Sequence, residues 1–130
     1  MANTIVHFEI PADDPEKIGK FYAELFDWKI EKSEGPTDYW LVGTREGEDQ
    51  PGVDGGIFLK ESPELAPVNY VGVDSVEEYV KKAESLGAQV VYPRSSVPQQ
   101  GWFAQILDPE GNLFALWEAD ESAPMLEEAS

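Results

Sequence analysis

The sequence has no cysteine, one histidine, few basic residues and no long apolar run. Without cysteine the chain forms no disulfide and offers neither a thiolate nucleophile nor a cysteine ligand for zinc. Nine basic side chains stand against 26 acidic ones, and the net charge of -17 argues against nucleic-acid or membrane-surface partners, because both carry negative charge. No apolar run approaches the roughly 18 residues that span a bilayer, and Met1 to Phe8 lacks a signal-peptide pattern. We therefore expect a soluble, cytoplasmic protein.

The composition is that of one folded domain. A chain of 130 residues fits a single domain, which buries about two-thirds of the surface that its unfolded chain exposes. Hydrophobic residues make up 42% and aromatic residues 12%, more than a disordered chain carries, so the acidic side chains must cover a folded body. Such a surface serves solubility, reflects a saline environment or attracts a cationic small molecule, and the sequence leaves these alternatives open.

The first half of the chain follows the pattern strand, helix and three strands. Thr4 to Ile10 is an apolar, β-branched run, Asp14 is placed as a helix N-cap, and Pro15 stands at the first helical position. Apolar residues at helical offsets then predict a helix that ends near Asp27 and packs this stripe on a sheet. The stripe is Ile18, Phe21, Tyr22, Leu25 and Phe26, and the strands that follow are expected at 29–32, 38–43 and 55–60.

The second half repeats this pattern. Val68 to Val73 is again a strand, Ser75 caps a helix with Glu78 in a capping box, and Gly87 supplies a left-handed stop. A repeat of about 60 residues, in which each copy has one apolar sheet face, implies that the two copies pair to bury that face. The last strands are expected at 89–92, 102–107 and 113–117.

Four segments resemble motifs of one known family. They are His7-Phe8-Glu9-Ile10, the helix end Lys20-Phe21-Tyr22-Ala23-Glu24-Leu25-Phe26-Asp27-Trp28, Leu86-Gly87-Ala88, and Asp108-Pro109-Glu110-Gly111-Asn112. In this order they resemble the vicinal-oxygen-chelate (VOC) superfamily of glyoxalases, bleomycin-resistance proteins and extradiol dioxygenases. Segments 101–104 and 114–118 are similar to a glyoxalase-like subgroup. The resemblance implies an α+β fold, in which two βαβββ modules form a cupped sheet, and a homodimer.

The pattern and the resemblance together give the domain organisation. We expect one VOC domain over residues 1–120, with module one at 1–62 and module two at 66–120, followed by a flexible acidic tail at 121–130. The sequence does not decide whether the modules pair within one chain or across the dimer.

The resemblance also implies four metal-ligand positions, of which this chain keeps at most one. His7 stands seven residues before the first helix N-cap, whereas Val68 stands seven before the second, where a metal-binding relative carries histidine. On the last strand Ala115 replaces a glutamate ligand, and the strand 55–59 has no ligating side chain. One imidazole falls short of the usual three or four protein ligands, so we predict no metal and no other cofactor.

His7 and Glu9 lie two residues apart on a strand and should therefore point to the same side, into the cup. A carboxylate beside an imidazole suits a general base or the binding of a polar ligand. The alternative is a half-exposed histidine that is hydrogen-bonded to a neighbour. Glu118 points away from the cup by alternation from Ala115, so we do not expect it to be a ligand.

Aromatic side chains are expected around this pair. Alternation places Tyr70 and Trp117 in the cup, and its rim carries Tyr39 or Trp40 and Trp102 or Phe103. An aromatic lining is typical of a pocket for a planar or apolar molecule, with ordinary core packing as the alternative. The two glycines Gly55 and Gly56 allow a close backbone approach or a bulge. The predicted ligand-binding residues are His7, Glu9, Tyr39, Tyr70, Trp102 and Trp117.

These features favour a protein that binds an apolar or aromatic ligand and needs no metal to do so. The ligand is cationic if the acidic surface serves to attract it. The alternative is a glyoxalase-like metal-dependent lyase or isomerase. The chain lacks the ligands for that mechanism, and an anionic glutathione substrate would need a basic patch, for which only Lys60 and Arg94 stand near the loops. A third alternative is an interaction module whose cup is filled by its own side chains. The sequence does not decide whether any reaction is catalysed.

Overall fold

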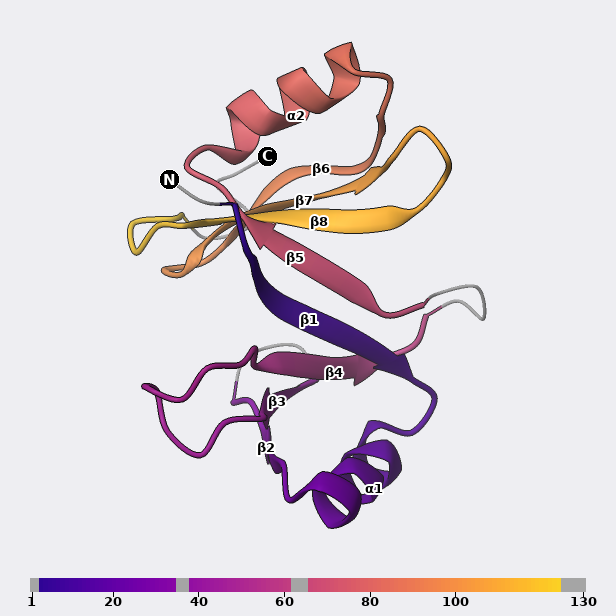
Figure 1. Cartoon of the computed structure of the whole chain (residues 1–130), viewed down its shortest axis with the longest axis vertical. Helices are drawn as coiled ribbons and strands as arrows, with labels where there is room; N and C mark the ends of the chain where they lie inside the picture. The colour runs from indigo at the N-terminus through magenta and orange to yellow at the C-terminus, as the bar shows by residue number, and fades with distance from the viewer. Residues whose placement is uncertain (1–2, 35–37, 62–65, 125–130) are drawn as a thin grey trace. The chain divides into compact units, whose positions relative to one another are not determined.

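A computed structural model describes residues 3–34, 38–61 and 66–124, which contain eight strands and two helices (Figure 1). The chain divides into two compact units. The N-terminal unit is Val6–Asn69, and the C-terminal unit is Tyr70–Ser130 together with Met1–Ile5. Neither described helix is long and apolar enough to cross a membrane.

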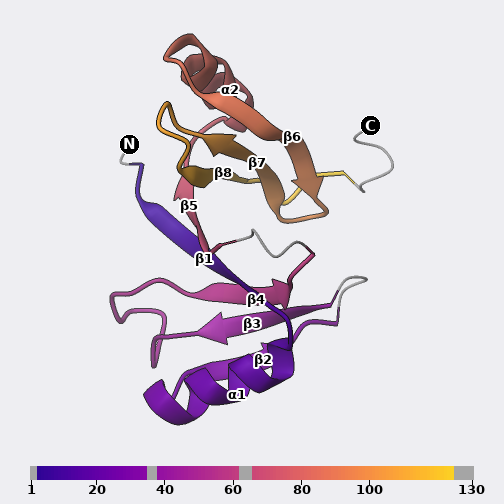
Figure 2. The same cartoon turned by 90° about the vertical axis from the view of Figure 1, so that its right-hand side faces the viewer.

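The N-terminal unit is built from one helix and a four-stranded sheet with the order β2-β3-β4-β1. Strand β1 pairs with β4 in parallel, and the other pairs are antiparallel. Helix α1 lies beside β2 (Figure 2). The elements are β1 (Ile5–Ala12), α1 (Pro15–Phe26), β2 (Lys29–Lys32), β3 (Tyr39–Gly43) and β4 (Gly55–Leu59).

Helix α1 begins and ends where the sequence predicts. The Asp14 carboxylate accepts a hydrogen bond from the Lys17 backbone N–H at 3.2 Å, and Pro15 follows in the first turn. The helix ends at Asp27, whose φ of 60° is left-handed. Its inner side packs on a core of Ala12, Val42 and Ile57, joined by Phe8, Ile10, Ile18, Trp28, Ile30 and Trp40.

The predicted apolar stripe of α1 does not all pack on the sheet. Ile18 joins the core, but the residues Phe21, Leu25 and Phe26 are 54%, 57% and 52% exposed. Phe26 and Tyr22 contact the Trp28 ring, with centroids 5.1 and 5.3 Å away. The expectation that the whole stripe packs on the sheet was therefore wrong for Phe21, Leu25 and Phe26, because the apolar arc of the helix is wider than the sheet face that it covers.

The C-terminal unit repeats this architecture with the strand order β5-β8-β7-β6. Strand β5 pairs with β8 in parallel, and β6, β7 and β8 are antiparallel. The Ser75 hydroxyl accepts a hydrogen bond from the Glu78 backbone N–H at 3.1 Å, and Gly87 has a φ of 101°. The core is Val76, Ala104, Ile106 and Leu116. The elements are β5 (Val68–Gly72), α2 (Val76–Ser85), β6 (Gln89–Val97), β7 (Gly101–Leu107) and β8 (Leu113–Ala119).

The predicted α+β class with two βαβββ modules is confirmed. Strand β6 is longer than predicted, because shifts in its register with β7 interrupt the alternation that marks a strand. Residues 3–5 belong to the C-terminal unit rather than to module one, and the Gly72 N–H donates to the Thr4 carbonyl at 2.8 Å. Ala123 is 4% exposed and its carbonyl accepts from the Gln99 N–H, so 121–124 differ from the expected flexible tail. Residues 125–130 of that tail lie outside the described residues.

Candidate ligand-binding site

Three of the predicted site residues come together on one face of the N-terminal sheet. Phe8 and Ile10 pack under α1, so His7 and Glu9 lie on the opposite side of β1, which we call the helix-free face. On β3 Trp40 packs in the same core, which places Tyr39 on the helix-free face. The structure therefore selects Tyr39 from the two alternatives that the sequence left open.

The Tyr39 hydroxyl connects the other two side chains. It donates a hydrogen bond to Glu9 Oε2 at 3.0 Å and lies 2.8 Å from His7 Nε2. Because a phenol has a single hydrogen, which Glu9 receives, His7 Nε2 must carry a hydrogen and donate it to the Tyr39 oxygen. The two hydrogen bonds that join His7, Tyr39 and Glu9 therefore run in one direction and end on the Glu9 carboxylate.

Gly56 makes room for this arrangement. It is buried on β4 opposite Glu9 and Leu41, and a Cβ at this position would overlap the Tyr39 ring and hydroxyl. The Tyr39 side chain therefore crosses the sheet over Gly56 to reach β1. The Gly55-Gly56 pair signalled a close approach in the sequence, but the group that approaches is a side chain of the chain itself. Which side chain it would be could not be read from the pair.

The surroundings of His7 favour its neutral form. Burial lowers the pKa of His7 below its usual 6.5, and the negative charges of Glu9 and Asp54 offset this only in part. Asp54 belongs to the loop before β4 and is bonded to the Arg45 guanidinium at 2.9 Å and to the Thr44 N–H at 2.9 Å. The Arg45 hydrogen bond is the main reason why the pKa of Asp54 is lowered. Sequence reasoning missed this loop, because charged residues in a loop carry no specific signal.

The C-terminal unit carries two of its three predicted residues, Tyr70 and Trp117, on a corresponding face. Ala104, Ile106 and Leu116 pack under α2, and the opposite face is the helix-free face of this unit. Tyr70 is paired with Ala115 on that face, and Trp117 lies two residues further along β8. A Cβ at Gly101 would lie 2.8 Å from the Trp117 ring, so this ring also covers a glycine. The single cup that would combine these residues with the His7–Tyr39–Glu9 cluster stays a prediction.

Trp102 does not lie with Trp117. It packs against the core under α2, its indole N–H donates to Asp120 Oδ2 at 3.0 Å, and the Arg94 guanidinium lies 3.7 Å from its ring centre. The choice of Trp102 as a cup residue is therefore corrected. Phe103 occupies the helix-free face instead, opposite Trp117 in the register, where it stacks on Tyr92 with centroids 5.3 Å apart.

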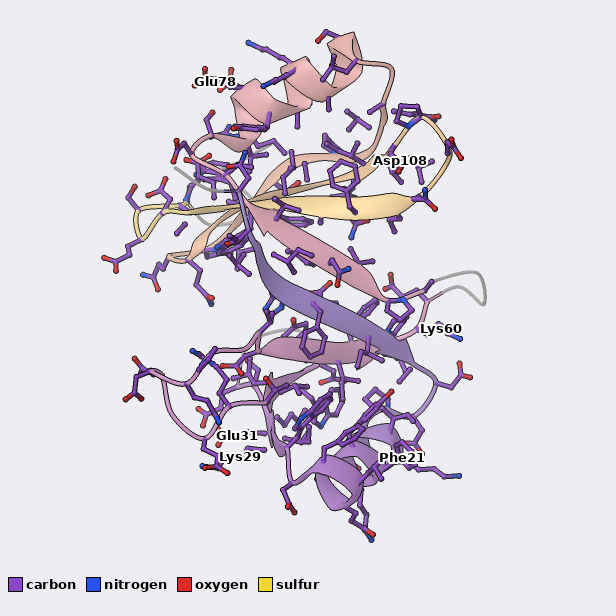
Figure 3. The ribbon with its side chains drawn as sticks, in the orientation of Figure 1. Phe21, Lys29, Glu31, Lys60, Glu78 and Asp108 are labelled. Atoms are coloured by element: carbon purple, nitrogen blue, oxygen red, sulfur yellow. The ribbon has the colours of Figure 1, made fainter. Side chains whose placement is uncertain are left out.

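Glu118 also lies on the helix side, as the alternation predicts. Its carboxylate accepts a hydrogen bond from the Val76 N–H at 2.9 Å, which satisfies a free donor at the start of α2. This contact gives Glu118 a structural task away from the helix-free face. Lys60 lies just beyond β4 (Figure 3), where its backbone N–H donates to the Ala12 carbonyl at 2.7 Å.

The residues at the family's metal positions do not fit a divalent ion. Val68 and Ala115 are 3% and 0% exposed and have no donor atom in their side chains. Strand β4 offers only glycine and apolar residues, which leaves the imidazole of His7. Across residues 3–34, 38–61 and 66–124, no group of three or more histidine, cysteine, aspartate or glutamate side chains is placed to hold a metal.

Sequence comparisons point to one family. A family model described as Glyoxalase/Bleomycin resistance protein/Dioxygenase superfamily matches residues 4–116. CFP32 of Mycobacterium bovis, which is provisionally named a glyoxylase, is 27% identical over 117 residues that cover 86% of this chain and 44% of that protein. A glyoxylase-like domain-containing protein of Didymella fabae is 29% identical over 114 residues that cover 83% of this chain and 88% of that protein. The chain thus spans less than half the length of the mycobacterial relative.

Solved structures share the fold. Hypothetical protein BH1468 from Bacillus halodurans C-125 has a TM-score of 0.70 at 18% identity and covers 96% of this chain and 100% of that chain. A methylmalonyl-CoA epimerase in complex with methylmalonyl-CoA and NH4+ has a TM-score of 0.70 at 11% identity, with the same coverage. The methylmalonyl-CoA epimerase from Mycobacterium tuberculosis has a TM-score of 0.68 at 12% identity and covers 92% of this chain and 93% of that chain. At such identities the likeness shows the fold alone.

Proposed function

Because this chain belongs to the Glyoxalase/Bleomycin resistance protein/Dioxygenase superfamily, we propose that it binds a small aromatic cation on the helix-free face of its N-terminal unit. The His7–Tyr39–Glu9 cluster is the polar anchor of this site. The observation that carries the proposal is the one-way hydrogen bonding from His7 through Tyr39 to Glu9.

The direction of these hydrogen bonds sets the kind of ligand. The neutral imidazole donates towards Tyr39, and the phenol donates towards Glu9, so the negative charge of the cluster lies on the carboxylate. A carboxylate has about four acceptor positions on its two oxygens, and a charged N–H donor forms its strongest hydrogen bonds. A protonated amine or amidine therefore complements this anchor better than an anion.

The charge of the chain points the same way. With 26 acidic and nine basic side chains, the surface attracts cations and repels anions before contact. The CoA thioesters named with the related epimerase structures carry several negative charges, so we do not expect them as ligands here. Within the N-terminal unit, the Tyr39 ring beside the carboxylate favours a ligand that carries a flat ring as well as a positive charge.

A metal-dependent glyoxalase-like reaction is the second candidate, and its support is the name of the two glyoxylase relatives. The lack of metal-binding side chains argues against this reaction, because Val68 and Ala115 stand where the family carries metal ligands. Elemental analysis and titration with Ni²⁺ and Zn²⁺, on wild type and His7→Ala, separate the two candidates. Binding of one metal per chain that depends on His7 would favour the reaction and contradict our ligand assignment.

Benzylamine is a direct probe of the proposed site. In an NMR titration we expect the backbone amides of His7, Glu9 and Tyr39 to shift, with a dissociation constant of about 1 mM or weaker for so small a molecule. Phenylacetate, which has a similar ring and the opposite charge, should shift none of them. Equal shifts with both compounds, or none with benzylamine, would contradict the proposal.

A pair of charge-neutralising variants shows whether Glu9 is the anchor. Glu9→Gln should weaken benzylamine binding about tenfold, because a charged hydrogen bond is lost. Glu31→Gln is the matched control, since Glu31 lies on β2 of the same sheet (Figure 3) and is paired with Leu41 rather than with the cluster. Equal weakening by both variants would mean that only the general acidity of the surface matters.

A further inference from the structure

One side of α1 combines exposed apolar side chains with two of the chain's nine basic residues. Phe21 and Leu25 are 54% and 57% exposed (Figure 3 labels Phe21) and line a shallow groove of about 400 Å³. The groove is completed by Lys17, Lys20 and Glu24. These five residues are called the Phe21 face below.

The Phe21 face is distinct from the side of α1 that holds the sheet. Ile18 packs in the core of the N-terminal unit, and Gly19 is buried against Ile30, whose Cγ2 would lie 2.9 Å from a Cβ at position 19. The sheet side of the helix is therefore filled. Because α1 lies on the opposite side of the sheet from the His7–Tyr39–Glu9 cluster, the Phe21 face is also separate from the proposed ligand site.

The charges of the Phe21 face change sign along the helix. Lys17 and Lys20 lie in its first half, whereas Glu24 lies in its second half and Asp27 caps its end. In an antiparallel pair of such helices, related by a two-fold axis, the lysines of each copy meet the acidic residues of the other. Phe21 and Leu25 of both copies then meet near the axis. A parallel pair would place lysine against lysine.

We propose that the Phe21 face is a symmetric contact between two copies of this chain, with their α1 helices antiparallel. With a net charge of -17, two copies repel over most of their surface, so they associate best where the local charges are self-complementary. The contact covers exposed apolar side chains at the same time. This pairing does not depend on the proposed ligand site.

The size of α1 predicts a weak dimer. A helix of 12 residues is about 18 Å long and presents less than the roughly 800 Å² per partner of a standard interface. We therefore expect a dissociation constant between about 10 μM and 1 mM. Sedimentation equilibrium of the full chain measures it directly.

Charge reversal on the Phe21 face tests the pairing. In K20E the new carboxylate faces Glu24 of the second copy, and in E24K the new amine faces Lys20 of the second copy. Each variant alone should associate about tenfold more weakly than wild type. An equal mixture of K20E and E24K should form a heterodimer at least as tight as the wild-type dimer, and the double variant K20E/E24K should recover association.

K81E on α2 is the matched control for K20E, because it makes the same change of net charge. Lys81 is an exposed lysine that pairs with Glu77 at 3.6 Å. It should leave association within about twofold of wild type. The substituted positions are exposed, and circular dichroism will confirm that all variants fold. A wild-type chain that stays monomeric up to about 1 mM, a dimer indifferent to K20E and E24K, or a mixture without heterodimer would each overturn the proposal.

Discussion

In the N-terminal unit the Tyr39 ring covers Gly56, and in the C-terminal unit the Trp117 ring covers Gly101. Both aromatic side chains lie on the helix-free face of their sheet. Each occupies the space that the Cβ atom would fill if the glycine on the neighbouring strand were replaced by any other residue. The groups they reach are different. Tyr39 bonds to His7 and Glu9, whereas the positions of the repeat that match these two are Val68 and Tyr70.

The two units therefore share their fold but not the polar cluster. Each unit must bury the apolar side of its helix against its sheet, and the two cores do so with similar residues. The helix-free face is under no such constraint, because the helix does not cover it. One unit could therefore carry a polar cluster there, whereas the other carries the aromatic side chains of Tyr70, Phe103 and Trp117.

The largest expected effect comes from filling the space under the aromatic rings. Gly101→Ala and Gly56→Ala should each lower the free energy of unfolding by about 3 kcal/mol, because the new methyl group overlaps Trp117 and the Glu118 backbone, or Tyr39. Gly43→Ala is the control, since its methyl group would meet the Lys29 Cβ at an ordinary 3.7 Å. Urea denaturation measures all three. A Gly56→Ala variant as stable as Gly43→Ala would show that Tyr39 does not need this space.

A smaller effect is expected when the polar cluster alone is removed. Tyr39→Phe keeps the ring over Gly56 but leaves His7 and Glu9 without the hydroxyl, which should cost about 1 to 2 kcal/mol in the free energy of unfolding. Tyr79→Phe is the matched control, because its hydroxyl accepts one exposed hydrogen bond from Asn3 at 3.0 Å. Urea denaturation should show a loss below about 0.5 kcal/mol for this control. Equal losses would mean that the cluster adds nothing beyond a surface hydrogen bond.

The next effect is a pH dependence of stability that comes from the N-terminal unit, because this unit carries the one histidine of the sequence. Burial lowers the pKa of His7 in the folded chain, so the unfolded chain binds a proton more readily as the pH falls below 6.5. The wild type should therefore lose stability relative to His7→Gln from pH 6.5 downwards, by at most about 1.4 kcal/mol per pH unit, and show no change above that pH. Denaturation curves of both proteins at several pH values measure the difference. A difference that grows above pH 6.5 would contradict the assignment.

The smallest effects are expected in acid, where one loop in each unit is held by a carboxylate. The Arg45 hydrogen bond lowers the pKa of Asp54. The pKa of Asp108 is lowered mainly by the hydrogen bond from the Asn112 backbone N–H, and next by the one from the Asn112 side chain. The stabilisation is present above the usual 3.8 and is lost as the pH falls through the lowered folded value. Because Asp54 is 40% exposed, Asp54→Asn should cost less than about 1 kcal/mol at pH 7.

Thermal melts against pH compare the two loops. Asp54→Asn and Asp108→Asn should each melt below wild type at neutral pH, and the differences should shrink below the usual aspartate pKa. Asp108→Asn should have the smaller effect, since the hydrogen bonds of Asp108 are exposed to solvent, whereas those of Asp54 are partly buried. A larger effect of Asp108→Asn would mean that the turn before β8 governs the loss of stability in acid, and that the Arg45–Asp54 ion pair does not.

The sequence predicted elements and faces well, because both follow from local periodicity. The N-caps Asp14 and Ser75 and the stop at Gly87 were correct, since each depends on a short-range backbone contact. The shared side of His7 and Glu9 followed from the two-residue period of a strand. The choice of Trp102 failed, because which residue of β7 lies opposite Trp117 depends on the register between strands.

By itself, then, the sequence determined the two βαβββ repeats, the acidic surface and the missing donors at Val68 and Ala115. The tertiary structure decided that Tyr39 crosses Gly56 to join His7 and Glu9, and that Phe21 stays exposed on α1. The physical reason is that side-chain alternation fixes the face on which a residue lies. The partner that it meets there depends on register, on the space left by residues far away in the chain, and on how much of a helix the sheet can cover.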